Sequence, residues 1–342
     1  MKQVRALAAA LAAPLAIGAV MLGCGGAPPP RPATAPEPTP LHVSPLTALT
    51  PAAALVWLLE VHPRVILGDG RLAAALAPVA PDARLQAFAR EWGGVDLRAA
   101  DTLVFASYPG ALLSLVHQTV DPGRIEAAFT ARVLTVEGRS ANPRAGITRL
   151  WGNVGSGREQ VAIFGGECVG LEQGRFGPLR IAELFAEEKL KRASPALKAP
   201  PLARVAELLG DAPIRAFAPG PFEGDLQRGA GGLLGASTAV GASIHVAEAK
   251  ELESPRLAVR ILLLGGWGGR SRAAADRLRA VFEVLAASGL GKLLGLSQLL
   301  AGPTVGDSSE ALTVDFTVDA ALLVTGLRAA TAAEAREIMG LF

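Results

Sequence analysis

Ser243 and His245 form a pair whose types suit nucleophilic chemistry, in which an imidazole base activates a serine hydroxyl. The alternation of residues 239–249 predicts a strand that turns both side chains to its polar face. Residues i and i+2 of a strand project in parallel, and the sequence implies no carboxylate to orient the histidine. The patterns G-x-S-x-G and S-x-x-K are absent from the chain. We therefore expect exposed polar strand residues and no catalytic residue. The alternative is an unrecognised hydrolase, which needs a concave site with an acidic neighbour.

Metal and thiol chemistry have no clear signal either. The four histidines are His42, His62, His117 and His245, and no two have the spacing of metal ligands. Cys168 stands among apolar strand residues without a local histidine or basic partner, which predicts a buried free thiol. We therefore predict no metal site.

Three glycine-rich stretches raise the question of phosphate binding. Residues 152–157 read G-x-x-G-x-G before a strand, whereas a dinucleotide site needs G-x-G-x-x-G before a helix. Residues 229–235 and 265–269 lack the Lys and Ser/Thr of a P-loop. We interpret all three stretches as turns or close backbone approaches, and we predict no cofactor.

The acidic residues have ordinary structural explanations. Glu187 and Glu188 precede lysines 189 and 191, which is typical of a solvated charged helix face. Asp319 is expected to cap a helix after the strand that carries Asp315, and Asp101 precedes a strand in a turn-like segment. The sequence therefore favours a protein that is not an enzyme.

The N-terminus carries a more specific pattern. Lys2 and Arg5 precede an uncharged apolar run over residues 6–22, as in a signal peptide. Val20-Met21-Leu22-Gly23-Cys24 resembles the lipobox of bacterial lipoproteins, although Met stands where Leu is usual. The resemblance implies a signal peptide over 1–23, cleavage before Cys24 and acylation of Cys24, so that lipid holds the protein on the membrane. An Asp directly after the cysteine would resemble a signal for retention at the inner membrane. Because Gly25 stands there instead, the resemblance favours the outer membrane of the cell envelope, on its periplasmic side. The alternative is an ordinary secretory signal with an incidental cysteine.

Residues 24–51 are expected to form a tether. Nine prolines lie between Gly25 and Pro51, and neither helix nor strand periodicity is visible there. Such a segment is extended, at about 3.1 Å per residue, and spaces a folded body from a membrane. A proline-rich ligand for a partner domain is the alternative.

Composition limits what the remaining residues can be. The chain has 342 residues, of which 50% are hydrophobic and 19% charged, so most of it can build a core. Loss of Lys2 and Arg5 with the signal peptide lowers 33 basic residues to 31, equal to the 31 acidic ones. That balance argues against nucleic acid as a partner, and two cysteines exclude a disulfide scaffold.

The body reads as strand–strand–helix units in two halves, residues 52–210 and 211–342. Residues 102–108 and 112–120 flank Pro109-Gly110 as a hairpin, and Asp121 then caps a helix. Further strands are expected at 147–151, 160–164, 168–171, 239–249, 257–265 and 312–318. Helices are expected near 81–92, 178–190, 200–209 and 271–285, after Asp319, and after a capping box at Thr331–Glu334. One-sided alternation predicts an α+β fold, a large mainly antiparallel sheet with helices on one face. We interpret the recurring order as duplication.

Residues 290–300 are unusually rich in leucine. They predict a buried core helix, or alternatively a surface that holds acyl chains or docks a partner. No uncharged apolar run after Cys24 is long enough for a second membrane span.

The body also resembles uncharacterised envelope lipoproteins of high-GC Gram-negative bacteria. The resemblance rests on Val95-Asp96-Leu97-Arg98, on Pro219-Gly220-Pro221-Phe222-Glu223-Gly224 with Leu233-Leu234-Gly235, and on residues 290–296. It implies a location and no activity. The sequence thus favours a lipid-anchored periplasmic protein with a non-enzymatic binding or scaffolding role, partnered by an envelope protein or an apolar ligand. A carrier or chaperone for an apolar ligand such as a lipid is the first alternative, and the hydrolase is the second.

Overall fold

The computed structural model describes residues 41–78, 80–155, 157–175, 177–190, 192–247 and 254–332, with side chains as far as 326. All of them belong to one compact unit, Pro38–Phe342. The predicted signal peptide, Cys24 and most of the predicted tether lie outside the described residues.

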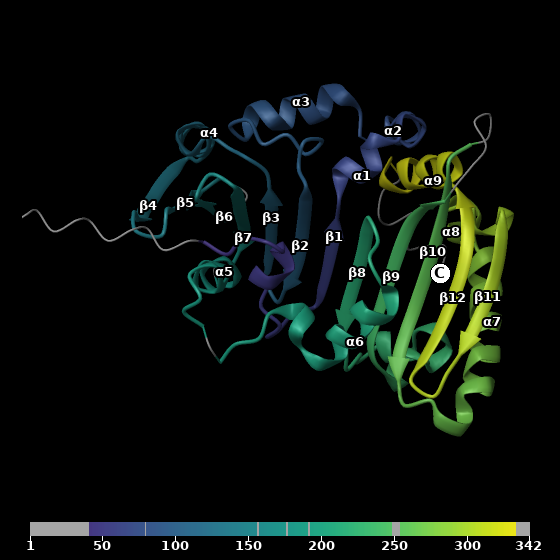
Figure 1. The fold of residues 1–342 in the computed structure, drawn as a ribbon. Coiled ribbons are helices and arrows are strands. Elements are labelled where there is room, and N and C mark those ends of the chain that lie inside the picture. The colour runs from purple at the N-terminus through teal and green to yellow at the C-terminus, as the bar shows by residue number, and fades with distance from the viewer. Residues whose placement is uncertain are drawn as a thin grey trace, which may run out of the picture. The chain divides into compact units, whose positions relative to one another are not determined.

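Strands of the described part form one antiparallel sheet in the order β11-β12-β10-β9-β8-β1-β2-β3-β7-β6-β5-β4 (Figure 1). This confirms the predicted α+β class and its large antiparallel sheet. The strands are β1 (Trp57–Val61), β2 (Thr102–Tyr108), β3 (Ala111–His117), β4 (Thr135–Asn142), β5 (Ile147–Asn153), β6 (Arg158–Phe164), β7 (Cys168–Gly174), β8 (Ile214–Pro219), β9 (Ser237–Ala247), β10 (Arg256–Gly265), β11 (Ala301–Asp307) and β12 (Ala311–Asp319).

The helices lie between these strands in the sequence. They are α1 (Pro63–Gly68), α2 (Gly70–Leu76), α3 (Asp82–Glu91), α4 (Pro122–Arg132), α5 (Pro178–Ala186), α6 (Pro200–Leu209), α7 (Ser271–Ala287), α8 (Gly289–Leu293) and α9 (Ala320–Ala332). Short 3-10 turns are η1 (Leu46–Leu49), η2 (Ala196–Lys198), η3 (Leu226–Arg228), η4 (Ala230–Gly232), η5 (Leu234–Ala236), η6 (Gly268–Arg270) and η7 (Leu296–Gln298).

Helices cover parts of both faces of the sheet, and not one face as the alternation predicted. We call face 1 the side that carries Leu58, Ala162 and Phe164, which pack with residues of η1, α5 and α6. Face 2 is the opposite side. There Val161 and Ile163 pack with α4, and a separate cluster packs β10 and β12 against α7. Because β6 is buried on both sides, its residues 161–164 form a continuous apolar run without alternation.

The two predicted halves share this one sheet, since β1 pairs with β8. Each half begins with three neighbouring strands, continues through a helix, and returns its last strand beside the third: β7 lies next to β3, and β12 next to β10. The described halves contribute seven and five strands, respectively, so the duplication stays a prediction.

The folded body begins earlier than residue 52, because residues 41–51 pack against it. Leu46 and Leu49 are each 1% exposed within the face 1 core. The backbone N–H of His42 donates to the carbonyl of Ala186 at 3.1 Å. The prediction of a tether is wrong for residues 41–51. It relied on the many prolines of the segment, whereas the burial of Leu46 and Leu49 stabilises a packed conformation.

Local signals placed most elements correctly. Asp121 and Asp319 each accept two backbone N–H bonds at the starts of α4 and α9, as predicted. Missed elements include β4, whose residues are mostly exposed and lack alternation. Thr331 lies inside α9 and does not start a new helix, and Glu334 lies outside the described residues.

The leucine-rich run 290–300 is not a buried core helix. It breaks into α8 and η7, because Gly295 adopts a left-handed backbone with φ of 76° that ends the helix. Leu293 and Leu300 are exposed at 38% and 47%. The alternative prediction, a surface that holds acyl chains or docks a partner, stays open.

Candidate functional site

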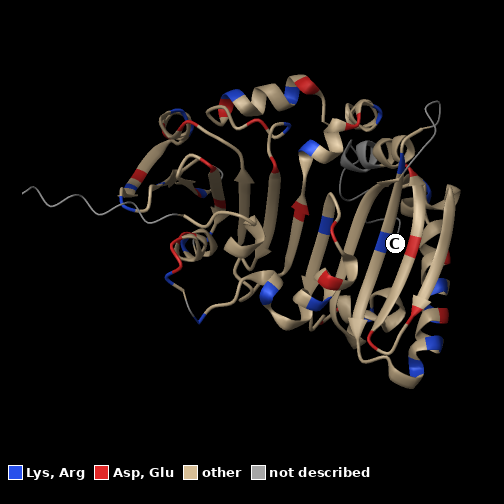
Figure 2. Cartoon of the chain, viewed as in Figure 1, with Lys and Arg blue, Asp and Glu red and all other residues tan. Residues whose placement is uncertain are grey.

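A line of polar residues crosses face 1 over neighbouring strands. Direct partners in the strand register are Glu60 with Arg215, Arg215 with Ser243, Ser243 with Arg260, and Arg260 with Asp315. Directly paired residues turn their side chains to the same face. We call these five residues the cross-strand row. The nearby strands β2, β3 and β9 carry no Lys, Arg, Asp or Glu (Figure 2), so the charges of the row stand out in this part of the sheet.

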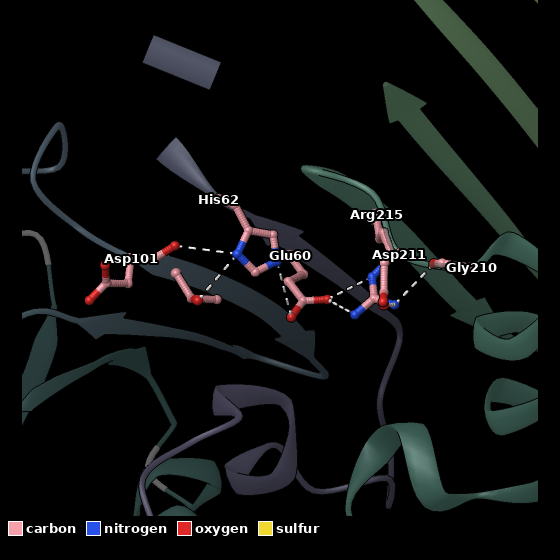
Figure 3. Close-up of polar contacts among 7 residues, drawn as sticks. Glu60, His62, Asp101, Gly210, Asp211 and Arg215 are labelled. Atoms are coloured by element: carbon pink, nitrogen blue, oxygen red, sulfur yellow. Dashed lines mark hydrogen bonds and ion pairs between the residues drawn. The ribbon is translucent and has the colours of Figure 1, made fainter. Parts of the chain in front are cut away.

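At one end of the row, Glu60 and Arg215 form a buried ion pair (Figure 3). The Arg215 Nε and Nη2 atoms donate to Glu60 Oε2 at 2.9 and 2.6 Å. The remaining Arg215 nitrogen, Nη1, donates to the carbonyl of Gly210 at 3.2 Å and lies 3.5 Å from Asp211 Oδ1. Arg215 is thus fully engaged by protein partners.

The polar contacts continue beyond Glu60 to Asp101. His62 Nε2 lies 3.7 Å from Glu60 Oε1, and His62 Nδ1 lies 3.3 Å from the Asp101 carbonyl oxygen (Figure 3). The Asp101 carboxylate pairs with Arg64 at 2.6 Å and with His117 at 3.5 Å. No pattern in the sequence connected the two histidines with Glu60 and Asp101. The pairing of β1, β2 and β3 brings them together, and no histidine spacing could have signalled it.

At the other end, the row runs into a hollow of about 360 Å³ on face 1. Its lining residues are Leu209, Ser243, His245, Ala258, Val259, Arg260, Ala301, Gly302, Thr304, Asp315, Phe316 and Thr317. They come from the end of α6 and from four adjacent strands, including β11 at the sheet edge.

Helix α6 closes one side of the hollow because Gly241 allows it to approach β9. A Cβ at Gly241 would lie 2.3 Å from Val205 Cγ1 and 2.8 Å from Leu209 Cδ1, too close for any side chain. Helix α6 ends at Leu209, and Ser243 is the next residue of β9 after Gly241 on the same face of the sheet. The hollow therefore begins where the helix stops.

Ser243 is 1% exposed, and its Oγ is buried without a hydrogen-bond partner in the described part of the chain. The sequence predicted an exposed polar residue, which is wrong. Its neighbours on both sides are arginines, and Leu209 at the end of α6 lines the same hollow, so a strand position that alternation assigns to solvent is enclosed. Buried hydroxyls are seldom left unpaired in proteins, so this one calls for an explanation.

Ser243 and His245 line the same hollow, as expected for residues i and i+2 of a strand. The two side chains form no hydrogen bond with each other, and the Asp315 carboxylate accepts from Arg260 Nε at 2.6 Å. The acidic group of the hollow thus engages the arginine, and no carboxylate among the described residues orients the His245 imidazole. The arrangement suits binding better than nucleophilic catalysis.

Other buried carboxylates have structural partners. Glu172 is fully buried and accepts from the N–H groups of Gly177 at 3.0 Å and Leu179 at 3.2 Å, at the start of α5. Burial raises the pKa of Glu172 above its usual range. Glu159 pairs with Arg132 at 2.5 Å on the opposite side of the sheet.

Cys168, Glu187 and Glu188, which the sequence also singled out, lie outside the hollow. Cys168 is free and buried, as predicted, and burial raises the pKa of its thiol to about 12. Glu187 is 7% exposed and bonds Lys189 at the end of α5, so it is not part of a solvated helix face, whereas Glu188 is exposed. Lys191 lies outside the described residues.

A second cavity, of about 540 Å³, lies between α1, α2 and α3. Apolar residues supply most of its lining, which includes Leu67, Leu76 and Leu85 with four alanines, and Arg64, Asp82 and Arg98 border it. Asp82 and Asp96 neutralise Arg98, and Asp101 neutralises Arg64. This cavity thus offers a mainly apolar surface, and both arginines at its border are paired with aspartates.

Within the described ranges, no helix is long and apolar enough to cross a bilayer, and no three metal-binding side chains gather in one place. No protein-family model, curated protein or solved structure matches the chain.

Proposed function

We propose that this protein is a lipid-anchored binding module on the periplasmic side of the cell envelope, held at the outer membrane by acylated Cys24. Its body takes a small polar ligand in the hollow at the end of α6 and performs no catalysis. One observation carries the binding role. The Ser243 Oγ is buried and unpaired among the described residues, and Ser243 belongs to the lining of the hollow, so a ligand that bonds the Oγ would satisfy it.

The dimensions and setting of the hollow support this role. Its volume of about 360 Å³ lies within the range of small-molecule sites. It lies at an open end of a rigid sheet, and strand positions hold side chains more firmly than loops do. The lipobox-like sequence at Val20–Cys24 supports the anchor.

The cavity between α1, α2 and α3 favours a second candidate function, a carrier for an apolar ligand such as a lipid. Its lining of leucines and alanines between α1 and α3 suits an acyl chain rather than a polar group. A lipid extract of the purified full chain, analysed by mass spectrometry, tests this candidate. Lipid recovered in stoichiometric amount would favour the carrier, and its absence would count against it.

Metabolic labelling with an alkyne fatty acid tests the anchor. Wild type should be labelled, and Cys24→Ser should not. Cys168→Ser is the matched control, because its thiol is buried and should play no part in acylation. Label that persists in Cys24→Ser would overturn the anchor.

Thermal-shift screening of the full chain in detergent against a panel of small polar metabolites tests the hollow. A ligand that binds there should lose its stabilising effect in Arg260→Gln. Arg279→Gln is the control, because Arg279 is an arginine of similar exposure (44% against 46%) paired with Asp276 on α7. A panel without binders, or binders unaffected by Arg260→Gln, would count against the proposal.

A further inference from the structure

The hollow that ends the cross-strand row offers several side chains that can donate hydrogen bonds to a ligand. Ser243, Thr304 and Thr317 contribute hydroxyls, and His245 contributes an imidazole. Asp315 is the acidic residue of the lining, and one of its oxygens already accepts from Arg260. A ligand that supplies acceptors would match this wall.

Arg260 supplies the strongest of these donors. Its one hydrogen bond within the described part of the chain runs from Nε to Asp315 Oδ1 at 2.6 Å. Its two terminal nitrogens therefore carry N–H groups without a protein acceptor among the described residues. Arg215, on the other side of Ser243, differs because Glu60, Gly210 and Asp211 engage all of its nitrogens.

Ser243 lies beside Arg260 in the register, on the same face of the sheet. The two side chains are therefore adjacent in the lining of the hollow, and a ligand group placed over β9 and β10 would lie beside both. A guanidinium matches the planar geometry of a carboxylate, and bonds to a charged acceptor are stronger than neutral ones.

The charge of the site limits the ligand further. Asp315 neutralises much of the Arg260 charge, since the two groups form an ion pair. A dianion such as phosphate would meet repulsion from the Asp315 carboxylate, whereas a monoanion would meet less. The apolar residues of the lining, Leu209, Ala258 and Ala301, suit a short uncharged remainder.

We infer that the hollow binds a small monocarboxylate, with its carboxylate on the Arg260 terminal nitrogens and the Ser243 hydroxyl, and its uncharged remainder along the end of α6. This inference rests on the proposed function, because it assigns the ligand class of the same hollow.

Calorimetric titration of the full chain in detergent tests it, with N-acetylalanine as the probe. Its amide and inorganic phosphate are the comparison compounds. N-acetylalanine should bind at least tenfold more tightly than either compound, since a bond to a charged acceptor is worth about a factor of ten or more. Arg260→Gln and Ser243→Ala should each weaken its binding about tenfold or more, and Arg279→Gln should leave it unchanged.

The outcomes separate this inference from the proposed function. Equal binding of the amide, or tighter binding of phosphate, would overturn the monocarboxylate while leaving the hollow as a ligand site. Failure of N-acetylalanine, together with an Arg260-dependent binder from the metabolite panel that has no carboxylate, would also overturn the monocarboxylate alone. Failure of N-acetylalanine and of the whole panel would overturn both. Circular dichroism of each variant establishes that it is folded. If Ser243→Ala does not fold, Arg260→Gln decides the result, because its side chain is partly exposed.

Discussion

Glu60 and Arg215 face each other across the β1–β8 pair, the seam at which the two halves of the sheet meet. Two N–H···O bonds to a single carboxylate oxygen join them, and the Glu60 side chain is 4% exposed. A carboxylate buried to this extent is stable only with its partner. The pair therefore fixes the register at the seam and starts the row that leads to the hollow.

Loss of one partner should be costly. We predict that Glu60→Ala lowers the free energy of unfolding by about 3–5 kcal/mol, because Arg215 loses its buried counter-charge and keeps the exposed Asp211 carboxylate, 3.5 Å away, in its place. Denaturant titration of the full chain measures this. The control is Glu126→Ala, which breaks the exposed pair with Arg139 and should cost at most about 1 kcal/mol. Equal losses in the two variants would contradict the role of the seam.

Leu46→Ala tests whether residues 41–51 belong to the folded body. Because Leu46 is 1% exposed, its truncation should cost about 2–5 kcal/mol of unfolding free energy. Val65→Ala, at a position 59% exposed, should change the unfolding free energy by no more than about 0.5 kcal/mol. If Leu46→Ala is as mild as Val65→Ala, the segment behaves as a tether after all.

Cys168 should be inert in the folded protein. Burial raises the pKa of its thiol to about 12, so the reactive thiolate is scarce at pH 8 and a thiol reagent has no access. If Cys24 is acylated, native protein should therefore give no colour with Ellman's reagent. Unfolded protein should show one thiol per chain if Cys24 is acylated, and two if it is not. Rapid native reaction that Cys168→Ser abolishes would contradict the buried position.

Glu172 should make stability depend on pH. Burial raises its folded pKa above the unfolded value, so its ionisation costs stability as pH rises from the unfolded value through the folded one. We predict that Glu172→Gln gains stability relative to wild type as pH rises across that window, measured by thermal unfolding at several pH values. Glu91→Gln, at an exposed position of α3, is the control. A difference that moves against the variant with rising pH would refute the prediction.

Local sequence determined the individual elements of this protein. Alternation located β12, with Leu312, Val314 and Val318 buried on one side, and acidic caps located the starts of α4 and α9. The apolar neighbours of Cys168 identified its burial. These features depend on residues close together in the chain, which is why a pattern of two or 3.6 residues reveals them.

Tertiary structure alone decided the candidate site. Alternation tells which side of its own strand Ser243 occupies, but not that Arg215 and Arg260 flank it or that Leu209 of α6 lines the same hollow. The same holds for Glu60, whose partner lies 155 residues away. The physical reason is that lateral neighbours in a sheet depend on the order in which strands pair, and that order is set by packing of the whole chain.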